Sequence, residues 1–473
     1  MTNIELDFIR SATALDSMVS PNARVLEWIR ERRTAVSTTV TQVPLRQLRK
    51  WSREASTGNI RHESGRFFSI EGIRVRTDWG GVPEWDQPII NQPEIGFLGL
   101  LAKKFDGLLH VLVQAKIEPG NINLVQISPT LQATRSNYSQ VHQGKRPRYL
   151  EYFNGERKTS LLLDQLQSEQ GARFLRKRNR NIIVELQSDE SIESHPDFTW
   201  MSIGQIKRLM REDNIVNMDT RTVLSGIGYG SYSAETLEGL FALAPTSREH
   251  RLMLGSALSS GNALSDFRSI ISWITGLKSR HDLTVKLVAI NQLEQWGEVD
   301  GEIRRADGKY FSVIGVNVAI DNREVISWDQ PMIKPAQEGL IAFIVRPIGG
   351  VYHFLVQAKL EAGNFDIVEL APTVQCLTGN YRVGSSEYSV HYINEVLSAT
   401  ADRVIFSSMQ SEEGGRFFYE QNRNMIVEVG EEFPLEVAEN YCWMTLNQIL
   451  RLIEFNNYLN IAARSLISAI TFS

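Results

Sequence analysis

Two ten-residue stretches, LVQAKIEPGN from Leu112 and LVQAKLEAGN from Leu355, carry polar side chains at every second position. Alternate side chains of a β-strand point to the same face, so glutamine, lysine and glutamate would share one face and valine and alanine the other. A strand that faces water alternates in the same way, and this is the commoner case. Both copies, however, keep Gln, Lys and Glu at the same positions, and both have a histidine two residues before the stretch, at His110 and His353. A polar-lined concavity needs such specific side chains because buried polar groups need partners. The pattern therefore favours a ligand-facing sheet in each copy.

Other polar residues recur around these stretches. An Asn-Tyr pair and two arginines occur in both copies: Asn137-Tyr138 and Asn380-Tyr381, Arg173 and Arg416, Arg180 and Arg423. Guanidinium groups match phosphate oxygens in geometry, so the arginines suit a phosphorylated ligand. Internal pairing with the nearby Glu169 and Glu412 is an equally good interpretation of the same arginines.

The two copies differ after the shared tyrosine. The first copy contains one histidine and three basic residues, and the second copy has no lysine or arginine at those positions: His142, Lys145, Arg146 and Arg148. We therefore expect the first copy to have the stronger anion site.

The repeat extends far beyond these motifs. An offset of 243 residues relates the two quoted stretches, and the same offset relates WDQPII at Trp85 to WDQPMI at Trp328. The chain is therefore a tandem duplication, with repeats over 20–228 and 265–473 and a linker over 229–264. A period this long indicates two whole domains rather than a solenoid.

Each repeat contains runs rich in β-branched and aromatic residues, preceded and followed by helical patterns. Ser202-x-x-Gln205 and Thr445-x-x-Gln448 are predicted capping boxes that begin a closing helix. The sequence predicts an α+β fold with mixed-sheet domains and flanking helices.

The overall composition excludes several functional classes. The net charge of −5 argues against a polyanion-binding protein, and the basic run at 176–180 is best interpreted as a solvated face. The two cysteines fit a reducing compartment. The N-terminus lacks signal-peptide features, and no stretch approaches the roughly 18 apolar residues of a membrane helix. We expect a cytoplasmic protein that binds neither nucleic acid nor membrane.

Known cofactor motifs are also missing from the sequence. There is no Walker loop, HExxH, GxSxG or Cys/His cluster with metal spacing, and GIGYG at 226–230 follows a helix rather than a strand. The sequence therefore predicts no metal site and no bound redox cofactor.

The doubled motifs WDQP, LVQAK-x-E-x-GN, PT-x-Q-x-x-x-x-NY, QSE-x-G-x-RF and NRN resemble those of the NDP-hexose 2,3-dehydratase family, from about Ala23 onward. The resemblance implies two Nudix-like domains, usually in a homodimer, each with a nucleotide-sugar pocket, of which one is catalytic. The stretches after Gly120 and Gly363 lack the glutamates of the Nudix box. A metal-dependent pyrophosphohydrolase is therefore not expected.

The family resemblance also implies a reaction. The expected substrate is similar to dTDP-4-keto-6-deoxy-D-glucose. A base removes the C3 proton beside the ketone, and the C2 hydroxyl then leaves with a proton from an acid. The product is a 3,4-diketo sugar, which a separate NADPH-dependent 3-ketoreductase captures, so the dehydratase itself needs no cofactor.

Candidate residues follow from this chemistry. The possible acids and bases are Lys116, Glu118, Tyr138 and His142. Lys116, Gln114 or Tyr138 can donate to the enolate, although Lys116 beside Glu118 can instead be a simple ion pair. The hypothesis for substrate binding includes Trp85, Asp86, Gln114, Thr130, Arg135, Asn137, Lys145, Arg146, Arg148, Tyr149, Arg173 and Arg180. The second pocket would contain Trp328, Gln357, Lys359, Glu361, Thr373, Asn380, Tyr381, Arg416 and Arg423.

Three alternatives remain open at the level of sequence. A nucleotide-sugar epimerase, or a dehydratase that acts on another sugar, would share the C3 deprotonation. A non-catalytic nucleotide-sugar-binding protein would use the same polar residues for binding alone. A surviving Nudix-type hydrolase would show itself by dependence on Mg²⁺.

Overall fold

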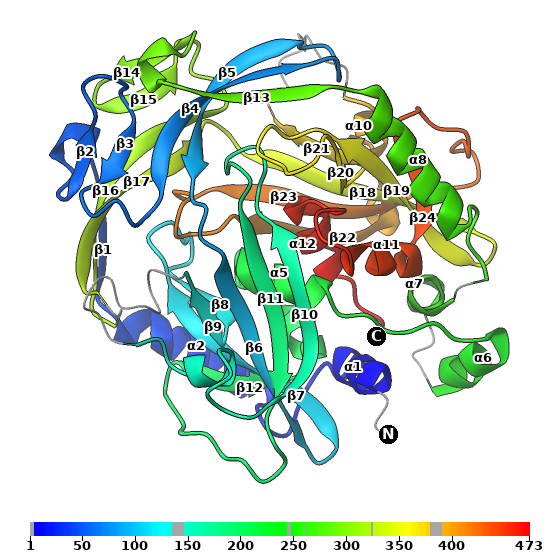
Figure 1. The fold of residues 1–473 in the computed structure, drawn as a ribbon. Helices are drawn as coiled ribbons and strands as arrows, with labels where there is room; N and C mark the ends of the chain where they lie inside the picture. The colour runs from blue at the N-terminus through cyan, green and yellow to red at the C-terminus, as the bar shows by residue number, and fades with distance from the viewer. Residues whose placement is uncertain (1–3, 135–145, 244–246, 260, 323–324, 379–389) are drawn as a thin grey trace.

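The structure is a computed structural model that describes residues 4–134, 146–243, 247–259, 261–322, 325–378 and 390–473. It contains two similar halves, each with one large and one small β-sheet (Figure 1). The sheets are mixed and helices pack around them, so the predicted α+β fold and the duplication are confirmed. Within the described residues no helix has the length and apolar character needed to cross a membrane.

Each large sheet has seven strands in the described part of the chain. In the first half these are β6 (Gly96–Phe105), β7 (Leu108–Ile117), β8 (Val125–Pro129), β9 (Leu131–Ala133), β10 (Ser160–Ser168), β11 (Arg178–Glu185) and β12 (Phe198–Met201). In the second half they are β18 (Gly339–Ile348), β19 (Val351–Lys359), β20 (Glu369–Ala371), β21 (Val374–Leu377), β22 (Val404–Ser411), β23 (Gln421–Glu428) and β24 (Tyr441–Thr445). One parallel pair in each sheet, β6 with β11 and β18 with β23, makes it mixed.

The two small sheets exchange strands between the halves. The first contains β2 (Trp51–Arg53), β3 (Ile60–His62), β4 (Ser69–Thr77) and β5 (Glu84–Asn91), and the second contains β14 (Trp296–Val299), β15 (Glu302–Arg305), β16 (Phe311–Ile320) and β17 (Ser327–Pro335). β13 (Leu283–Val288) of the second half pairs with β4, and β1 (Thr38–Val43) of the first half pairs with β16 (Figure 1). Each half therefore completes a sheet of the other.

Helices cover the sheets and join the halves. They are α1 (Ile4–Thr13), α2 (Asn22–Ala35), α4 (Ile203–Leu209), α5 (Met218–Ser225), α6 (Ala234–Leu243), α7 (Arg248–Leu258), α8 (Phe267–Arg280), α10 (Ile393–Leu397), α11 (Leu446–Ile453) and α12 (Ile461–Ser468). Both predicted capping boxes are present, at Ser202 for α4 and Thr445 for α11. α5 and α12 pack against each other at the centre, and one continuous apolar core includes residues of both halves.

The segment predicted as a linker, 229–264, contains α6 and α7 rather than an extended connection. The hydroxyl of Ser256 in α7 donates to the carbonyl oxygen of Tyr352 at 2.5 Å. Ser11 in α1 makes the equivalent bond to Leu109 at 2.7 Å. α7 is thus the counterpart of α1, and it packs on β19 as part of the second half. The boundaries at 228 and 265 stay a prediction.

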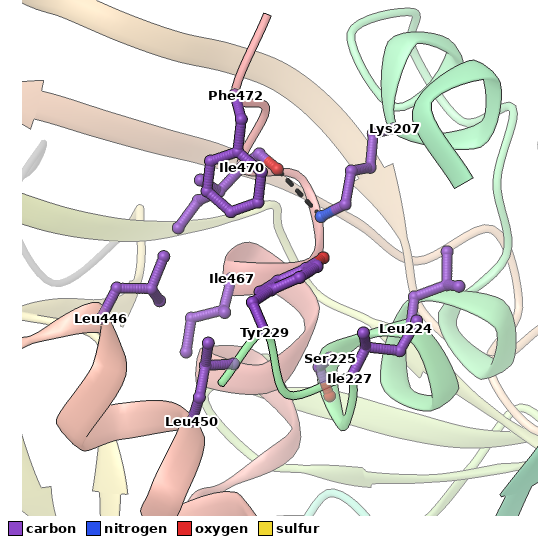
Figure 2. A pocket seen from close by; sticks show the side chains of 10 residues that line it. All are labelled: Lys207, Leu224, Ser225, Ile227, Tyr229, Leu446, Leu450, Ile467, Ile470 and Phe472. Carbon is purple, nitrogen blue, oxygen red and sulfur yellow. Dashed lines mark hydrogen bonds between the residues drawn. The ribbon is translucent and has the colours of Figure 1, made fainter. Parts of the chain in front are cut away.

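Lys207 of α4 is hydrogen-bonded to the C-terminal end of the chain. Its ammonium group donates to the carbonyl oxygens of Ser468 and Ile470, at 2.8 and 2.9 Å, beside a small apolar pocket (Figure 2). A cation at the end of α12 is favourable because a helix C-terminus carries partial negative charge. Burial nevertheless lowers the pKa of Lys207 to about 7.

Candidate active site

Two glycine contacts bring a loop of each half against a strand end of the other half. The backbone N–H of Gly120, which follows β7, donates to the carbonyl oxygen of Gly414 at 2.7 Å. Gly363, which follows β19, makes the same bond to Gly171 at 2.7 Å. The GN of the LVQAK motif therefore meets the QSE-x-G motif of the opposite half, and this explains why both motifs contain glycine.

The first of the resulting sites is built on β7. Lys116 and Glu118 are both buried, with their Nζ and Oε1 atoms 3.6 Å apart. The amide of Gln132 donates to Glu118 Oε1 at 2.9 Å. Gln132 is oriented in turn by Ser128, at 2.9 Å, and by Asn217, at 3.3 Å. The other carboxylate oxygen, Glu118 Oε2, is buried and has no hydrogen-bond partner among the described residues.

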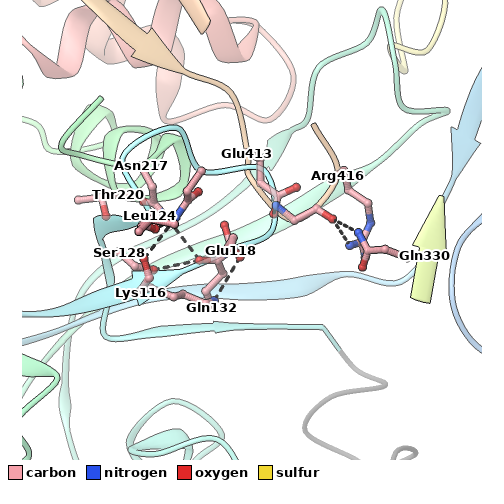
Figure 3. Close-up of polar contacts among 12 residues, drawn as sticks. Lys116, Glu118, Leu124, Ser128, Gln132, Asn217, Thr220, Gln330, Glu413 and Arg416 are labelled. Atoms are coloured by element: carbon pink, nitrogen blue, oxygen red, sulfur yellow. Dashed lines mark hydrogen bonds and ion pairs between the residues drawn. The ribbon is translucent and has the colours of Figure 1, made fainter. Parts of the chain in front are cut away.

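Residues of the second half complete this first site. Glu413 and Arg416 lie on the loop that Gly120 contacts, and Figure 3 shows them opposite Lys116, Glu118 and Gln132. Gly415 donates its N–H to Glu413 Oε1 at 2.9 Å. The guanidinium of Arg416 lies 4.2 Å from the ring centroid of Phe68, a residue of the first half. Each site is therefore composed of both halves.

The charges of the first site affect one another. Burial and the nearby negative charge of Glu118 raise the pKa of Glu413 to about 7. Burial and the charge of Glu413 raise the pKa of Asp219, at the start of α5, well above its usual range. Burial lowers the pKa of Arg416, while Glu413 and Glu118 favour its charged form. A carboxyl group with a pKa near neutrality can serve as an acid or a base.

The second site repeats this plan with different details. Gln375 donates to Glu361 at 2.9 Å and accepts from Asn460 at 2.8 Å. The ammonium of Lys359 donates to the backbone carbonyl of Gln375 at 2.7 Å, and burial lowers the pKa of Lys359. Burial lowers the pKa of Arg173, while the nearby Glu420 and Glu361 favour its charged form.

At four positions the first site has a hydroxyl or carboxyl group that the second site lacks. The first site contains side chains that can donate or accept protons: Ser128, Asp219, Thr220 and Glu413. At an offset of 243 residues, the second site contains Ala371, Ala462, Ala463 and Gln170. The shared lysine, glutamate, glutamine, asparagine and arginine form a common framework. At these four positions only the first site adds hydroxyl and carboxyl groups to it.

Two buried arginines anchor the loops of the sites. Arg221 of α5 donates to the carbonyl oxygen of Ser411 and, at 2.5 Å, to the hydroxyl of Ser465. Arg464 of α12 donates to the carbonyl oxygen of Ser168 and to the hydroxyl of Thr222. Ser411 stands two residues before Glu413, so Arg221 fixes the strand end that carries this carboxyl group.

The structure brings only some of the predicted site residues together. Lys116 and Glu118 meet in the first site, and Lys359 and Glu361 in the second. The two arginines exchange places relative to the prediction, because Arg416 of the second half lies at the first site and Arg173 at the second. Arg135, Asn137, Tyr138, His142, Lys145, Asn380 and Tyr381 lie outside the described residues.

The WDQP motifs are hydrogen-bonded to the loops that form the sites. Asp86 forms two hydrogen bonds with Arg74, at 2.9 and 2.8 Å, and Trp296 of the other half donates to its carbonyl oxygen. Trp85 and Trp328 each donate to the glutamine two residues later, at 3.0 and 2.8 Å. In the second motif this glutamine is Gln330, whose side-chain amide donates to the carbonyl oxygen of Gly415 at 2.6 Å.

The remaining candidates have contacts of their own. Thr130 and Thr373 bond to backbone groups of the neighbouring strands, and the Tyr149 hydroxyl donates to the backbone carbonyl oxygen of Glu193 at 2.9 Å. Arg146 pairs with Glu156, and Arg180 with Asp164. Gln114 and Gln357 are half-buried on β7 and β19, Arg148 is exposed beside Tyr149, and Arg423 is exposed on β23.

Sequence reasoning missed Glu413, Gln132 and Asn217 as site residues. A signal for Glu413 was present, since QSEQG of the first repeat becomes QSEEG in the second. Gln132 and Asn217 recur as Gln375 and Asn460 in the same register. Among the described residues no group of three His, Cys, Asp or Glu side chains has the arrangement of a metal site.

Comparison with known proteins agrees with this duplicated site. The family model for NDP-hexose 2,3-dehydratase matches residues 22–227 and 267–470. A protein of Saccharopolyspora spinosa named dTDP-4-dehydro-6-deoxy-alpha-D-glucopyranose 2,3-dehydratase is 45% identical, over 98% of this chain and 94% of its own. Proteins with the same name from Streptomyces violaceoruber and Amycolatopsis orientalis are 42% and 40% identical, covering 94% and 97% of this chain and 95% and 92% of their own. The chain belongs to the NDP-hexose 2,3-dehydratase family, as its doubled motifs predicted.

Proposed function

We propose that this protein is a hydro-lyase that converts dTDP-4-keto-6-deoxy-D-glucose into the corresponding 3,4-diketo-2,6-dideoxy sugar. Family membership and the names of three near-full-length relatives support this assignment. The observation that carries the chemistry is the buried Lys116–Glu118 pair, in which Glu118 Oε2 has no hydrogen-bond partner among the described residues.

Each member of the pair has a role in the first half of the reaction. The 4-ketone makes the C3 hydrogen acidic, and the C3–H bond breaks as Glu118 takes the proton. Negative charge then develops on the ketone oxygen, and the ammonium of Lys116 stabilises it in a site with little water. Gln132 occupies the first oxygen of Glu118 and leaves the second oxygen to act as the base. Tyr138 and His142 remain hypothetical contributors.

The second half of the reaction is an elimination. The enolate returns its electrons to the carbonyl, a C2=C3 double bond forms, and the C2 hydroxyl leaves as water after receiving a proton. The resulting enol becomes the 3,4-diketone by moving its O3 proton to C2. No electrons are exchanged with a cofactor in any of these steps.

The assignment includes several predictions about context. We propose that the two halves have Nudix-like folds, that the enzyme is a cytoplasmic homodimer, and that an NADPH-dependent 3-ketoreductase consumes its product. For the diphosphate we propose two described basic residues, the half-buried Arg416 at the first site and the exposed Arg148.

Incubation with dTDP-4-keto-6-deoxy-D-glucose, without metal or NADPH, tests this function. The diketone is unstable, so chromatography should show released dTDP and maltol. A 3-ketoreductase with NADPH should divert this flux to a stable 2-deoxysugar. Recovery of a C3 epimer would identify an epimerase instead, and unchanged but bound substrate would identify a binding protein. Release of dTMP only with Mg²⁺ would identify a Nudix-type hydrolase.

A further inference from the structure

We propose that Glu413, a residue of the second half, is the general acid that protonates the C2 hydroxyl as it leaves, and that the first site is therefore the catalytic one. This inference rests on the proposed dehydration. In this step the C2–O bond breaks, the Glu413 proton moves to the leaving oxygen, and Glu413 is left as a carboxylate that recovers a proton from water.

The position of Glu413 carries the argument. Its loop is held against the end of β7 by the bond between Gly120 and Gly414, and against α5 through Arg221 and Ser411. Glu413 lies across from Glu118 (Figure 3), and the two carboxyl groups interact electrostatically. One site therefore contains carboxyl groups from both halves, and Glu413 retains partial exposure through which a substrate can reach it.

The environments separate the roles of these two carboxyl groups. Glu118 is paired with Lys116 and accepts a hydrogen bond from Gln132 on one of its carboxylate oxygens. Burial and the negative charge of Glu118 favour the protonated form of Glu413. Two neighbouring carboxyl groups in such different surroundings are suited to act as base and acid.

The second site provides an internal comparison. Glutamine at 170 has nearly the same shape as glutamate at 413, but an amide cannot donate a proton to a leaving hydroxyl. The second site contains other carboxyl groups, but both are buried: Glu369 accepts a hydrogen bond from Ser168 at 2.8 Å, and Glu420 lies near Arg173. The base framework is thus present in both sites, whereas the half-buried acid is present in the first.

Glu413→Gln is the decisive variant because it gives the first site the residue type of the second. We expect kcat for elimination to fall by about 10²–10⁴-fold, the usual range for a lost general acid. Hydrogen exchange at C3 should continue, because Glu118 and Lys116 are unchanged. Incubation in D₂O, with the substrate examined by NMR, resolves deuterium at C3 from deuterium at C5, the other position beside the ketone.

The pH profile provides a second readout. A general acid must be protonated, so wild-type kcat should fall as pH rises through the pKa of Glu413, which lies at about 7. This limb should be missing from Glu413→Gln. Glu413→Asp keeps a carboxylic acid. This variant should recover part of kcat, and its kcat should again fall as pH rises. Glu439→Gln, on an exposed side chain at the surface, is the matched control and should behave as wild type.

Each outcome decides the proposal. Lost elimination with retained C3 exchange supports it. Elimination within about threefold of wild type, or loss of both elimination and C3 exchange, overturns the role of Glu413 as acid. If Glu413→Gln unfolds, the exchange ratio and pH profile of Glu413→Asp decide instead. A wild-type enzyme that neither exchanges nor eliminates overturns the proposed function itself.

Discussion

The backbone N–H of Gly120 donates to the carbonyl oxygen of Gly414 at 2.7 Å, across 294 residues of sequence. This bond sets the first-half pair Lys116–Glu118 against the second-half loop that carries Glu413. A Cβ atom at position 120 would overlap the carbonyl oxygen of Phe417. The close approach of the two halves therefore requires glycine at this position.

We expect Gly120→Ala to push the Glu413 loop away from the first site. The free energy of unfolding should fall by about 1–3 kcal/mol, as for other overpacked sites, and kcat by about 10²-fold because the acid is misplaced. Urea unfolding and product assays measure the two effects. Gly276→Ala is the matched control, since it lies inside α8 with open space around it and should stabilise the protein slightly. Equal behaviour of the two variants would contradict the crossing contact.

Lys116→Met and Lys359→Met compare the two sites directly. Lys116→Met should lower kcat by about 10²–10³-fold because it removes the cation beside the developing enolate. Lys359→Met should affect kcat far less, since the second site lacks the half-buried acid. Steady-state kinetics of both variants gives the comparison. A larger kcat loss in Lys359→Met would show that the second site is the catalytic one.

Lys207→Met should change how stability depends on pH. Burial places the folded-state pKa of Lys207 at about 7, against 10.5 in the unfolded chain. Between these values the unfolded chain binds more protons, so this residue makes the folded state more stable as pH rises, by at most about 1.4 kcal/mol per pH unit. Below pH 7 both states are protonated and the effect is constant.

Urea unfolding at pH 6, 7.5 and 9 in buffers of roughly equal ionic strength tests this effect. The stability difference between wild type and Lys207→Met should move in favour of wild type as pH rises. The variant also leaves the carbonyl groups of Ser468 and Ile470 without this donor, which adds a loss that does not depend on pH. A difference that stays constant from pH 6 to 9 would show that Lys207 remains charged in the folded protein.

The exchanged strands predict that neither half folds alone. A fragment of residues 1–245 lacks β13, which β4 needs as a partner, and a fragment of 246–473 lacks β1, which β16 needs. Expressed separately, each should show no cooperative thermal unfolding. Co-expression should give a soluble, active complex that copurifies. Cooperative unfolding of 1–245 by itself, within a few degrees of the intact protein, would show that the exchange is dispensable.

Much of the architecture was predictable because it depends on local patterns. The offset of 243 residues established the duplication, and the capping boxes at Ser202 and Thr445 are local signals that the structure confirms. Alternation along β7 predicted that Val111, Val113 and Ala115 lie in the core and that Lys116 and Glu118 meet in a polar site. His110 on the same strand instead bonds to Ser17 at 2.6 Å, because α1 and the chain after it cover that end.

The sequence by itself determined the chemistry that each half contains: a lysine and a glutamate two residues apart, and a second glutamate that is glutamine in the other copy. The tertiary structure decided which halves share a site. Two similar repeats offer similar strand edges and loops, so local sequence cannot distinguish pairing within a half from pairing between halves. Glycine at 120 and 363, strand exchange through β1 and β13, and the arginines of α5 and α12 select the crossed arrangement. Glu413 thereby lies beside Glu118, a residue to which no local pattern connects it.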